Sequence, residues 1–149
     1  MRQIVYALQF AGKAVPADEA GTVLNARLSA SPCTITTSSD SGACEGVIRA
    51  STGARSTFES KVTFTGETTF NEEGTITLGE GGDSIRFSTV GQGYLGGSTD
   101  PKVKHGCVAW KIESGTGRFD GATGLITSNF LVTAEGDVTD HHFGVIFLK

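Results

Sequence analysis

The sequence predicts an all-β protein that folds as one closed antiparallel barrel of about eight strands around a central ligand cavity. Threonine, valine, isoleucine and phenylalanine alternate with polar residues over much of the chain, as is typical of half-buried strands. Glycine, which occurs 21 times, interrupts the chain together with Asn, Asp and Ser. Helical periodicity is nearly absent. Many strands with short links form an antiparallel sheet, and closure leaves no exposed edges, so we favour a barrel over a two-layer sandwich.

The 149 residues fit a single domain, which we expect to span 1–149. Each expected strand is a run of alternating or β-branched residues between turn residues. The segments FNEEGTI, GEGGDSI and TAEGDVT are interpreted as short loops between strands. The expected strands lie near residues 2–10, 22–29, 33–38, 45–51, 56–69, 74–79, 83–90, 103–113, 123–134 and 138–148.

The clearest alternation is in the segment STFESKVTFTGETTF. Phe58, Val62 and Phe64 share one face of the expected strand, with Ser60 among them. The intervening residues are threonine, glutamate and lysine, so this strand has one dry and one wet face. The segment VAWKI repeats the pattern around Trp110.

A glycine-rich segment, SGTGRFDGATG at residues 114–124, separates two expected strands. Its glycine spacing differs from the dinucleotide-binding fingerprint, and a strand rather than a helix follows it. Glycine permits a positive φ and a close backbone approach, both of which suit a tight corner of a barrel. We expect Phe119 to lie beneath this corner as an apolar plug, with Arg118 and Asp120 facing outward.

The segment ESGTGRFDGATGLI resembles the hairpin that joins the last long strands in the allene oxide cyclase-like and dirigent-like barrel proteins. The segments FTGETTFNEEGTITL and DHHFGVIFLK fit the same strand order, and the resemblance covers about 74–149. It implies an eight-stranded barrel with a ligand cavity, no cofactor, and a homodimer as a plausible assembly. Members of this superfamily include cofactor-free cyclases that act on oxylipins or polyketides, some of them bacterial, and dirigent proteins that guide phenoxy-radical coupling.

The composition limits the partners of the chain. A net charge of −4, a pI near 5.3 and the lack of a basic cluster argue against nucleic acid. No apolar stretch approaches the roughly 20 residues that span a bilayer, so we expect no membrane partner. The first residues do not follow a signal-peptide pattern, and we expect a cytoplasmic protein unless a leader has been removed. Cys33 and Cys44 could meet across a hairpin, although free thiols in a reducing compartment are the favoured interpretation.

The segment TDHHFGVIFL holds the first candidate for catalysis. One of its two adjacent histidines must point inward, and an inward histidine can act as a general base or acid near neutral pH. His141 shares its face with phenylalanines, which makes it the first choice. Asp140 lies on the opposite face and could orient only His142. The alternative is an ordinary strand entry with solvated histidines.

Two further polar residues are candidates for the same site. Arg49 could hold an oxyanion or carboxylate of a ligand, or it could be exposed and paired with Glu45. Asn129 stands among apolar residues and could orient a carbonyl group, or it could bond a neighbouring strand.

The candidate ligand-binding residues are aromatic, because aromatic side chains suit a cavity wall as well as a core. They are Tyr6, Phe58, Trp110 and Phe143. His105 and Cys107 are too few to indicate a zinc site, so we expect no metal, and we expect Cys107 to be a buried thiol.

The leading functional hypothesis is a cofactor-free enzyme that binds one small apolar metabolite and promotes a cyclisation, an isomerisation, or an addition or elimination of the lyase type. Holding a reactive conformer would supply much of the catalysis. A carrier or dirigent-like binding protein without chemistry of its own is the first alternative. A barrel filled by its own side chains is the second.

Overall fold

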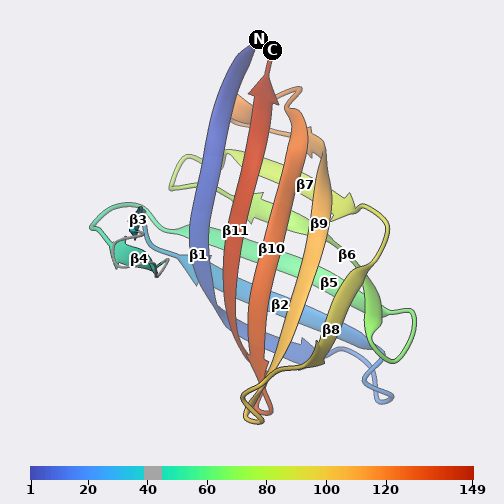
Figure 1. The fold of residues 1–149 in the computed structure, drawn as a ribbon. Coiled ribbons are helices and arrows are strands. Elements are labelled where there is room, and N and C mark those ends of the chain that lie inside the picture. The colour runs from blue at the N-terminus through green and yellow to red at the C-terminus, as the bar shows by residue number, and fades with distance from the viewer. Residues whose placement is uncertain (39–44) are drawn as a thin grey trace.

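A computed structural model of the chain describes residues 1–38 and 45–149, and strands dominate it (Figure 1). Among these residues, no helix has the length and apolar character needed to cross a membrane. A single turn of 3₁₀ helix, η2 (Gly117–Phe119), interrupts the strands. The strands are β1 (Arg2–Pro16), β2 (Val23–Ala30), β3 (Cys33–Ser38), β4 (Glu45–Ala50), β5 (Ser56–Phe64), β6 (Thr69–Thr77), β7 (Ser84–Thr89), β8 (Gly93–Gly97), β9 (Val103–Gly115), β10 (Thr123–Thr133) and β11 (Asp137–Leu148).

The main sheet closes on itself and confirms the predicted all-β barrel. Its strand order is β10-β11-β1-β2-β5-β6-β7-β9-β8, every pair is antiparallel, and β10 also pairs with β9. This last pairing, in which Ile126 lies opposite Trp110, joins the two ends of the sheet. β7 and β8 both lie between β6 and β9, so together they occupy one position of an eight-strand barrel.

β3 and β4 form a separate two-stranded hairpin that stands outside the barrel wall (Figure 1). Ile35 lies opposite Ile48 in this hairpin. Cys44, one half of the suggested cysteine pair, falls outside the described residues, and the pairing therefore stays open.

Two expectations about strand boundaries were wrong. The segment FNEEGTI is part of β6 and not a loop, and the turn lies instead at residues 65–68. The polar residues Asn71, Glu72 and Glu73 are typical of a turn, but here they belong to a strand. Alternation places Phe70 and Glu72 in the barrel interior and Asn71 and Glu73 outside. β8 was not predicted, because its sequence GYLGG lacks the usual strand composition.

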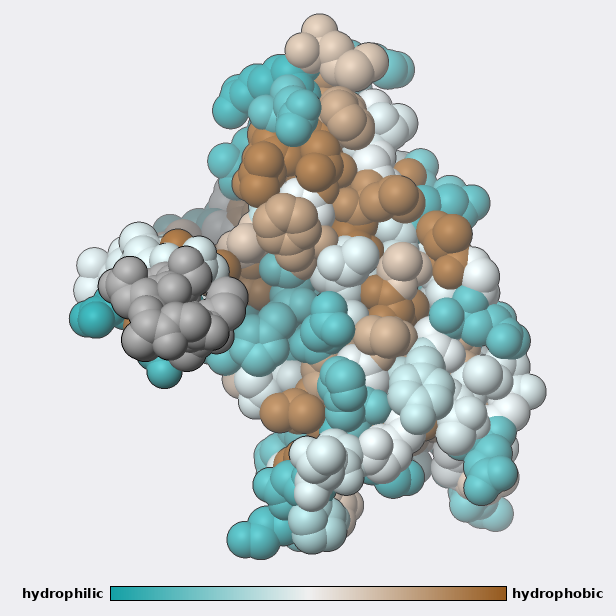
Figure 2. Space-filling model, in the orientation of Figure 1, coloured by the Kyte–Doolittle hydropathy of each residue, from teal (hydrophilic) through white to brown (hydrophobic). Residues whose placement is uncertain are grey.

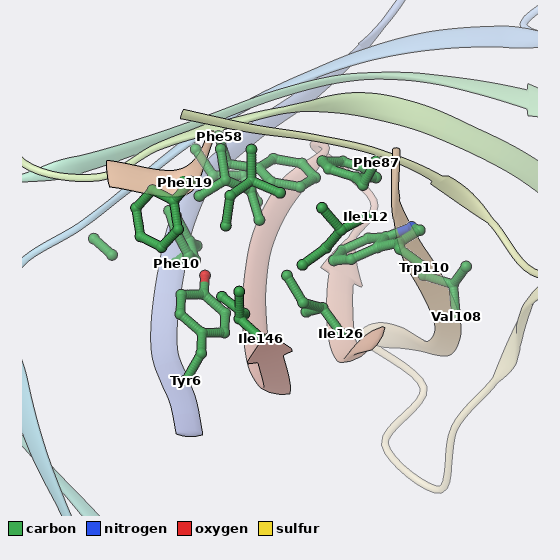
Figure 3. Close-up of a cluster of buried hydrophobic side chains, with 14 of the residues drawn as sticks. Tyr6, Phe10, Phe58, Phe87, Val108, Trp110, Ile112, Phe119, Ile126 and Ile146 are labelled. Carbon is green, nitrogen blue, oxygen red and sulfur yellow. The ribbon is translucent and has the colours of Figure 1, made fainter. Parts of the chain in front are cut away.

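Aromatic side chains fill the half of the barrel that lies toward the chain termini (Figure 3). Phe58 stacks on Phe87 with ring centres 5.4 Å apart, and Trp110 lies 4.5 Å from Phe87. Phe119 is buried at this end, as predicted for the glycine-rich corner. Arg118 faces outward and forms an ion pair with Asp83 at 3.0 Å. The end of the barrel near the chain termini is therefore closed by side-chain packing.

Replacing Gly124 by alanine tests the corner. Gly124 has φ +142°, and an added Cβ would lie 2.1 Å from the carbonyl oxygen of Val145. We expect Gly124→Ala to lower the free energy of unfolding by about 1–3 kcal/mol, measured by chemical denaturation. Gly46→Ala is the control, because nothing lies within 4 Å of its added Cβ. Equal stability of the two variants would contradict this account of the corner.

Candidate functional site

The interior of the barrel contains polar side chains as well as apolar ones. Along β11, alternation turns Val138, Asp140, His142 and Ile146 inward. Asp140 is 4% exposed and His142 3% exposed, whereas His141 is exposed on the outer face. The inward histidine is thus His142, which corrects the choice of His141.

A cavity of about 70 Å³ lies inside the barrel, in the half away from the packed end. Twelve of its fourteen lining residues are apolar, and the other two are the carboxylic acids Glu72 and Asp140. The apolar lining residues are Ala14, Leu24, Ala26, Leu28, Phe58, Val62, Phe64, Phe70, Leu95, Phe130, Val132 and Val138. An apolar cavity with a few convergent polar groups is the usual form of a small-molecule site.

The cavity leads to the open end of the barrel, opposite the chain termini. There a surface hollow of about 610 Å³ shares five lining residues with it: Ala14, Leu24, Phe64, Leu95 and Val132. Phe64, which lines both spaces, makes an edge-to-face contact with Phe70, and Phe70 makes one with Phe130, with ring centres 6.2 and 6.0 Å apart.

A chain of hydrogen bonds holds Asp140 in place. His142 Nε2 lies 2.9 Å from Asp140 Oδ2, and the Ser128 hydroxyl donates to Asp140 Oδ1 over 2.6 Å. On the other side of the ring, the Tyr6 hydroxyl lies 3.1 Å from His142 Nδ1. The geometry suits an imidazole whose Nε2–H donates to Asp140 and whose Nδ1 accepts from the Tyr6 hydroxyl.

Tyr6 remains a hydroxyl donor in this chain. Burial raises the pKa of Tyr6 well above its ordinary value, and the charge of Asp140 raises it further. The Tyr6 hydroxyl points into the interior (Figure 3). Tyr6 therefore fixes the orientation of the His142 ring rather than supplying a charge.

Glu72 is the second carboxyl group of the cavity, and it differs from Asp140 in its surroundings. The Ser60 hydroxyl donates to Glu72 Oε1 over 2.5 Å. Burial raises the pKa of Glu72 from its ordinary value of 4.5 to about 8. The Ser60 hydrogen bond opposes this rise, and the charge of Asp140 adds to it. At neutral pH Glu72 is thus a protonated acid beside an apolar cavity.

Three of the four predicted ligand-binding residues face the interior. Phe58 lines the cavity directly, and the buried Trp110 packs behind it with ring centres 5.6 Å apart. Tyr6 joins the hydrogen-bond chain described above. Their role toward a ligand stays a prediction.

The other predicted site residues lie outside the barrel. Phe143 is 57% exposed and belongs to an apolar area on the outer face of β1, β11 and β10 (Figure 2). His141 Nε2 lies 3.1 Å from the Gln9 side-chain nitrogen on that face, and Asn129 is its exposed neighbour on β10. Arg49 is exposed on the β3–β4 hairpin. None of the four lines the cavity. His141 and Phe143 were expected inside because the outer row of β11 is as apolar as the inner row.

The residues around Cys107 do not form a site. Cys107 and His105 are both exposed on the outer face of β9, so the expectation of a buried thiol was wrong. In residues 1–38 and 45–149, no group of three or more His, Cys, Asp or Glu side chains is placed to hold a metal ion.

Sequence reasoning missed Glu72, Ser60 and Ser128 as site residues. Each is a polar residue at an inward position of an otherwise apolar strand face. In β6, for example, Glu72 lies on the same buried face as Phe70 and Ile76. That signal was present in the sequence, and for Glu72 the interpretation of FNEEGTI as a loop concealed it.

The fold has a counterpart among solved structures. The structure of a dirigent protein, the pterocarpan synthase GePTS1, aligns with all of this chain and 88% of its own, with a TM-score of 0.50 and 14% sequence identity. The chain thus has the dirigent-like barrel fold expected from its resemblance. No family model and no curated protein matches the sequence.

The raised pKa of Glu72 predicts how stability depends on pH. The unfolded chain releases the Glu72 proton near pH 4.5, whereas the folded protein keeps it up to about pH 8. The stabilising contribution of this group to the free energy of unfolding is therefore largest below pH 4.5 and decreases as the pH rises from 4.5 to 8. Above pH 8 it no longer changes with pH. We expect Glu72→Gln, a neutral isostere, to remove this fall.

Urea denaturation at several pH values between 4.5 and 9 measures the effect. The control is Glu73→Gln, because Glu73 is exposed on the outer face of the same strand. The control should keep the pH dependence of the original protein. Parallel pH profiles for Glu72→Gln and the original protein would show that Glu72 is not a buried neutral acid.

Proposed function

We propose that the protein binds a small apolar molecule inside the barrel and promotes a proton transfer within it, as a cofactor-free isomerase, cyclase or lyase. The observation that carries this proposal is the pair of carboxyl groups, Glu72 and Asp140, in a cavity whose other lining is apolar. Burying two carboxyl groups costs free energy that a simple container or a packed core avoids. A buried acid with a raised pKa in a cavity, as Glu72 is here, is typical of acid–base catalysis.

Glu72 is the proposed general acid. One of its oxygens accepts the Ser60 hydrogen bond, which leaves the protonated carboxyl group able to donate to an oxygen atom of the ligand. A carbonyl, an epoxide or an ether oxygen meets this requirement. The raised pKa keeps this proton available at neutral pH.

Asp140 is the proposed general base. As a carboxylate it accepts hydrogen bonds from His142 and Ser128, and it lines the cavity. In an isomerisation or cyclisation, Asp140 takes one proton from a carbon atom of the ligand while Glu72 gives one proton to an oxygen. The composition of the ligand is then unchanged. The two carboxyl groups return to their starting states by proton exchange with solvent at the open end.

A barrel that binds and orients a molecule without reacting with it is the second candidate. The likeness to a dirigent protein supports this alternative, because the resemblance to dirigent-like barrels implies a protein that orients its ligand. The hydrogen-bond chain of Asp140 would then serve to orient polar groups of the ligand. The two candidates share the cavity and differ in whether the ligand changes.

A titration followed by product analysis separates the candidates. Trp110 is the only tryptophan and packs against the cavity residue Phe58, so its fluorescence reports binding. We expect a saturable change with at least one compound from a panel of apolar polyketides, oxylipins and phenylpropanoids, and conversion of that compound detected by mass spectrometry. Glu72→Gln and Asp140→Asn should each keep binding and lower the rate by about 10²–10⁴-fold.

His141→Gln is the matched control, since His141 lies next to His142 in the sequence but on the outer face. It should convert the compound at the original rate. Saturable binding with the compound recovered intact would favour the non-catalytic alternative. The lack of binding across the panel would overturn the proposed cavity function.

A further inference from the structure

The N-terminal half of β1 is a free edge of the barrel wall. β1 pairs with β11 from Arg2 to Lys13, but its pairing with β2 begins only at Ala11. In residues 1–38 and 45–149, no other strand pairs with residues 2–10, so this half of β1 has β11 on one side and no strand on the other (Figure 1). An unpaired edge of this kind is a template for pairing with another chain.

Alternate residues of this half direct their main-chain groups to the unpaired side. The N–H of Ala14 donates to the carbonyl oxygen of Gly136 on the β11 side, over 2.9 Å. The N–H of Ala17 donates to Val23 on the β2 side, over 2.8 Å. Because main-chain groups alternate between the two sides of a strand, even-numbered residues of β1 bond to β11 and odd-numbered residues face away from it. The odd-numbered residues at the centre of the free edge are Gln3, Val5 and Ala7.

A surface hollow of about 400 Å³ lies along this edge. Five consecutive residues of β1, 4–8, line it, and they come from both faces of the strand, so the hollow borders the edge rather than one face. The other lining residues include Leu78 and Phe119, together with Ile146 and Leu148 of β11. The hollow therefore lies where a further strand would pair with β1.

The hollow is positively charged, although the protein carries a net charge of −4. Arg2 and Arg118 line it, and none of its lining residues is acidic. Arg118 is paired with Asp83 at 3.0 Å, whereas no acidic group of the described residues lies within ion-pair distance of Arg2. The guanidinium of Arg2 is thus available to a carboxylate of a partner.

The sequence of this edge lacks the features that protect exposed edges. Native proteins place proline, lysine or other charged residues along such edges. The segment QIVYALQF, residues 3–10, contains neither proline nor a charged residue, and its β-branched and aromatic residues favour an extended strand. An unprotected edge beside an apolar hollow is the arrangement that binds an added strand.

We propose that this edge binds an extended peptide segment of a partner protein, which adds to β1 as an antiparallel strand with an acidic residue at its C-terminal end. Main-chain hydrogen bonds to Gln3, Val5 and Ala7 supply most of the affinity, and alternate apolar side chains of the peptide fill the hollow. Antiparallel pairing brings the C-terminal end of the peptide to Arg2. The inference goes beyond the proposed cavity function and is independent of it, because the hollow and the cavity share no lining residue.

A second copy of the barrel does not fit the same edge. Two identical strands pair antiparallel about a two-fold axis perpendicular to the sheet, which places the inner faces of both sheets on the same side. Both walls then curve toward that side, and the two closed barrels would overlap. A single extended segment has no such body and can follow β1 along the hollow.

Amide hydrogen exchange followed by NMR tests the edge without any partner. We expect the amides of Val5 and Ala7 to exchange at least about tenfold faster than those of Tyr6 and Leu8, because only the latter bond to β11. Slow exchange at Val5 and Ala7 would show that the edge is already covered, and the inference would be wrong.

A labelled peptide of alternating threonine and valine, fluorescein-TVTVTVTD-amide, is the probe for binding, which is followed by fluorescence anisotropy. Two N-methylated forms carry methyl groups on alternate amides, in one phase or in the other. Only one phase blocks the N–H groups that face β1, so we expect one form to bind at least about tenfold more weakly and the other to bind as the parent peptide does. Equal affinities of the two forms would contradict main-chain pairing.

Variants of β1 locate the peptide on the edge. Val5→Pro removes an N–H that faces the unpaired side and leaves the hydrogen bonds to β11 in place, so we expect it to weaken binding by at least about tenfold. Val5→Thr, which keeps the N–H, is the matched control and should bind as the original protein does. Arg2→Gln should weaken binding of the probe by about threefold and leave unchanged the binding of a peptide that ends in asparagine.

The outcomes separate this inference from the cavity function. Circular dichroism checks that each variant is folded, and the N-methylated peptides test the pairing on the original protein alone. If the parent peptide does not bind at millimolar concentration, or if Val5→Pro binds it as tightly as Val5→Thr does, the edge site is wrong. Neither result would change the expected titration of the cavity through Trp110.

Discussion

The pairing of β9 with β10 closes the barrel, and the arrangement of every group in the site depends on it. In an antiparallel pair, the register fixes which side chains face the same way, and closure carries that choice around the whole wall. Because Ile126 lies opposite Trp110, the register determines which residues of β9 and β10 face the interior. A shift of one residue would bring Lys111 inside and turn Trp110 to solvent. The site thus results from the register of the closing pair.

The barrel is divided into a packed half and a hollow half. Toward the termini, large rings and the plug of Phe119 fill the interior. Toward the other end, smaller residues such as Ala14 and Ala26 line the wall and leave space. The hydrogen-bonded group of Asp140, His142 and Tyr6 lies where the two halves meet. In the packed half, the His142 ring lies between Phe10 and Trp110, with ring centres 4.6 and 5.0 Å away. Packing on one side therefore orients the groups that line the space on the other.

Alternation in the sequence was enough to predict the barrel and the inward face of Phe58 and Trp110, but it could not assign the histidines. Alternation says which residues share a face and not which face is buried. In β11 both rows are apolar, since the outer row contains the exposed Phe143. Which row of β11 faces the interior depends on its pairing with the neighbouring strands β1 and β10. Arg49 was misplaced for a similar reason, because nothing in its strand-like segment shows that the β3–β4 hairpin leaves the wall.

The two carboxyl groups of the cavity differ in the hydrogen-bond donors that each receives. Asp140 accepts from both Ser128 and His142, and the ring is held in turn by Tyr6. Glu72 receives one hydroxyl donor, and burial holds its pKa near 8. Burial removes water from Glu72 and disfavours its charged form, which is the main cause of its raised pKa. A negative Asp140 further favours the neutral form of Glu72. The interior thus holds one carboxyl group with a raised pKa and a second one held by two hydrogen-bond donors, which is the asymmetry that the proposed acid–base chemistry would use.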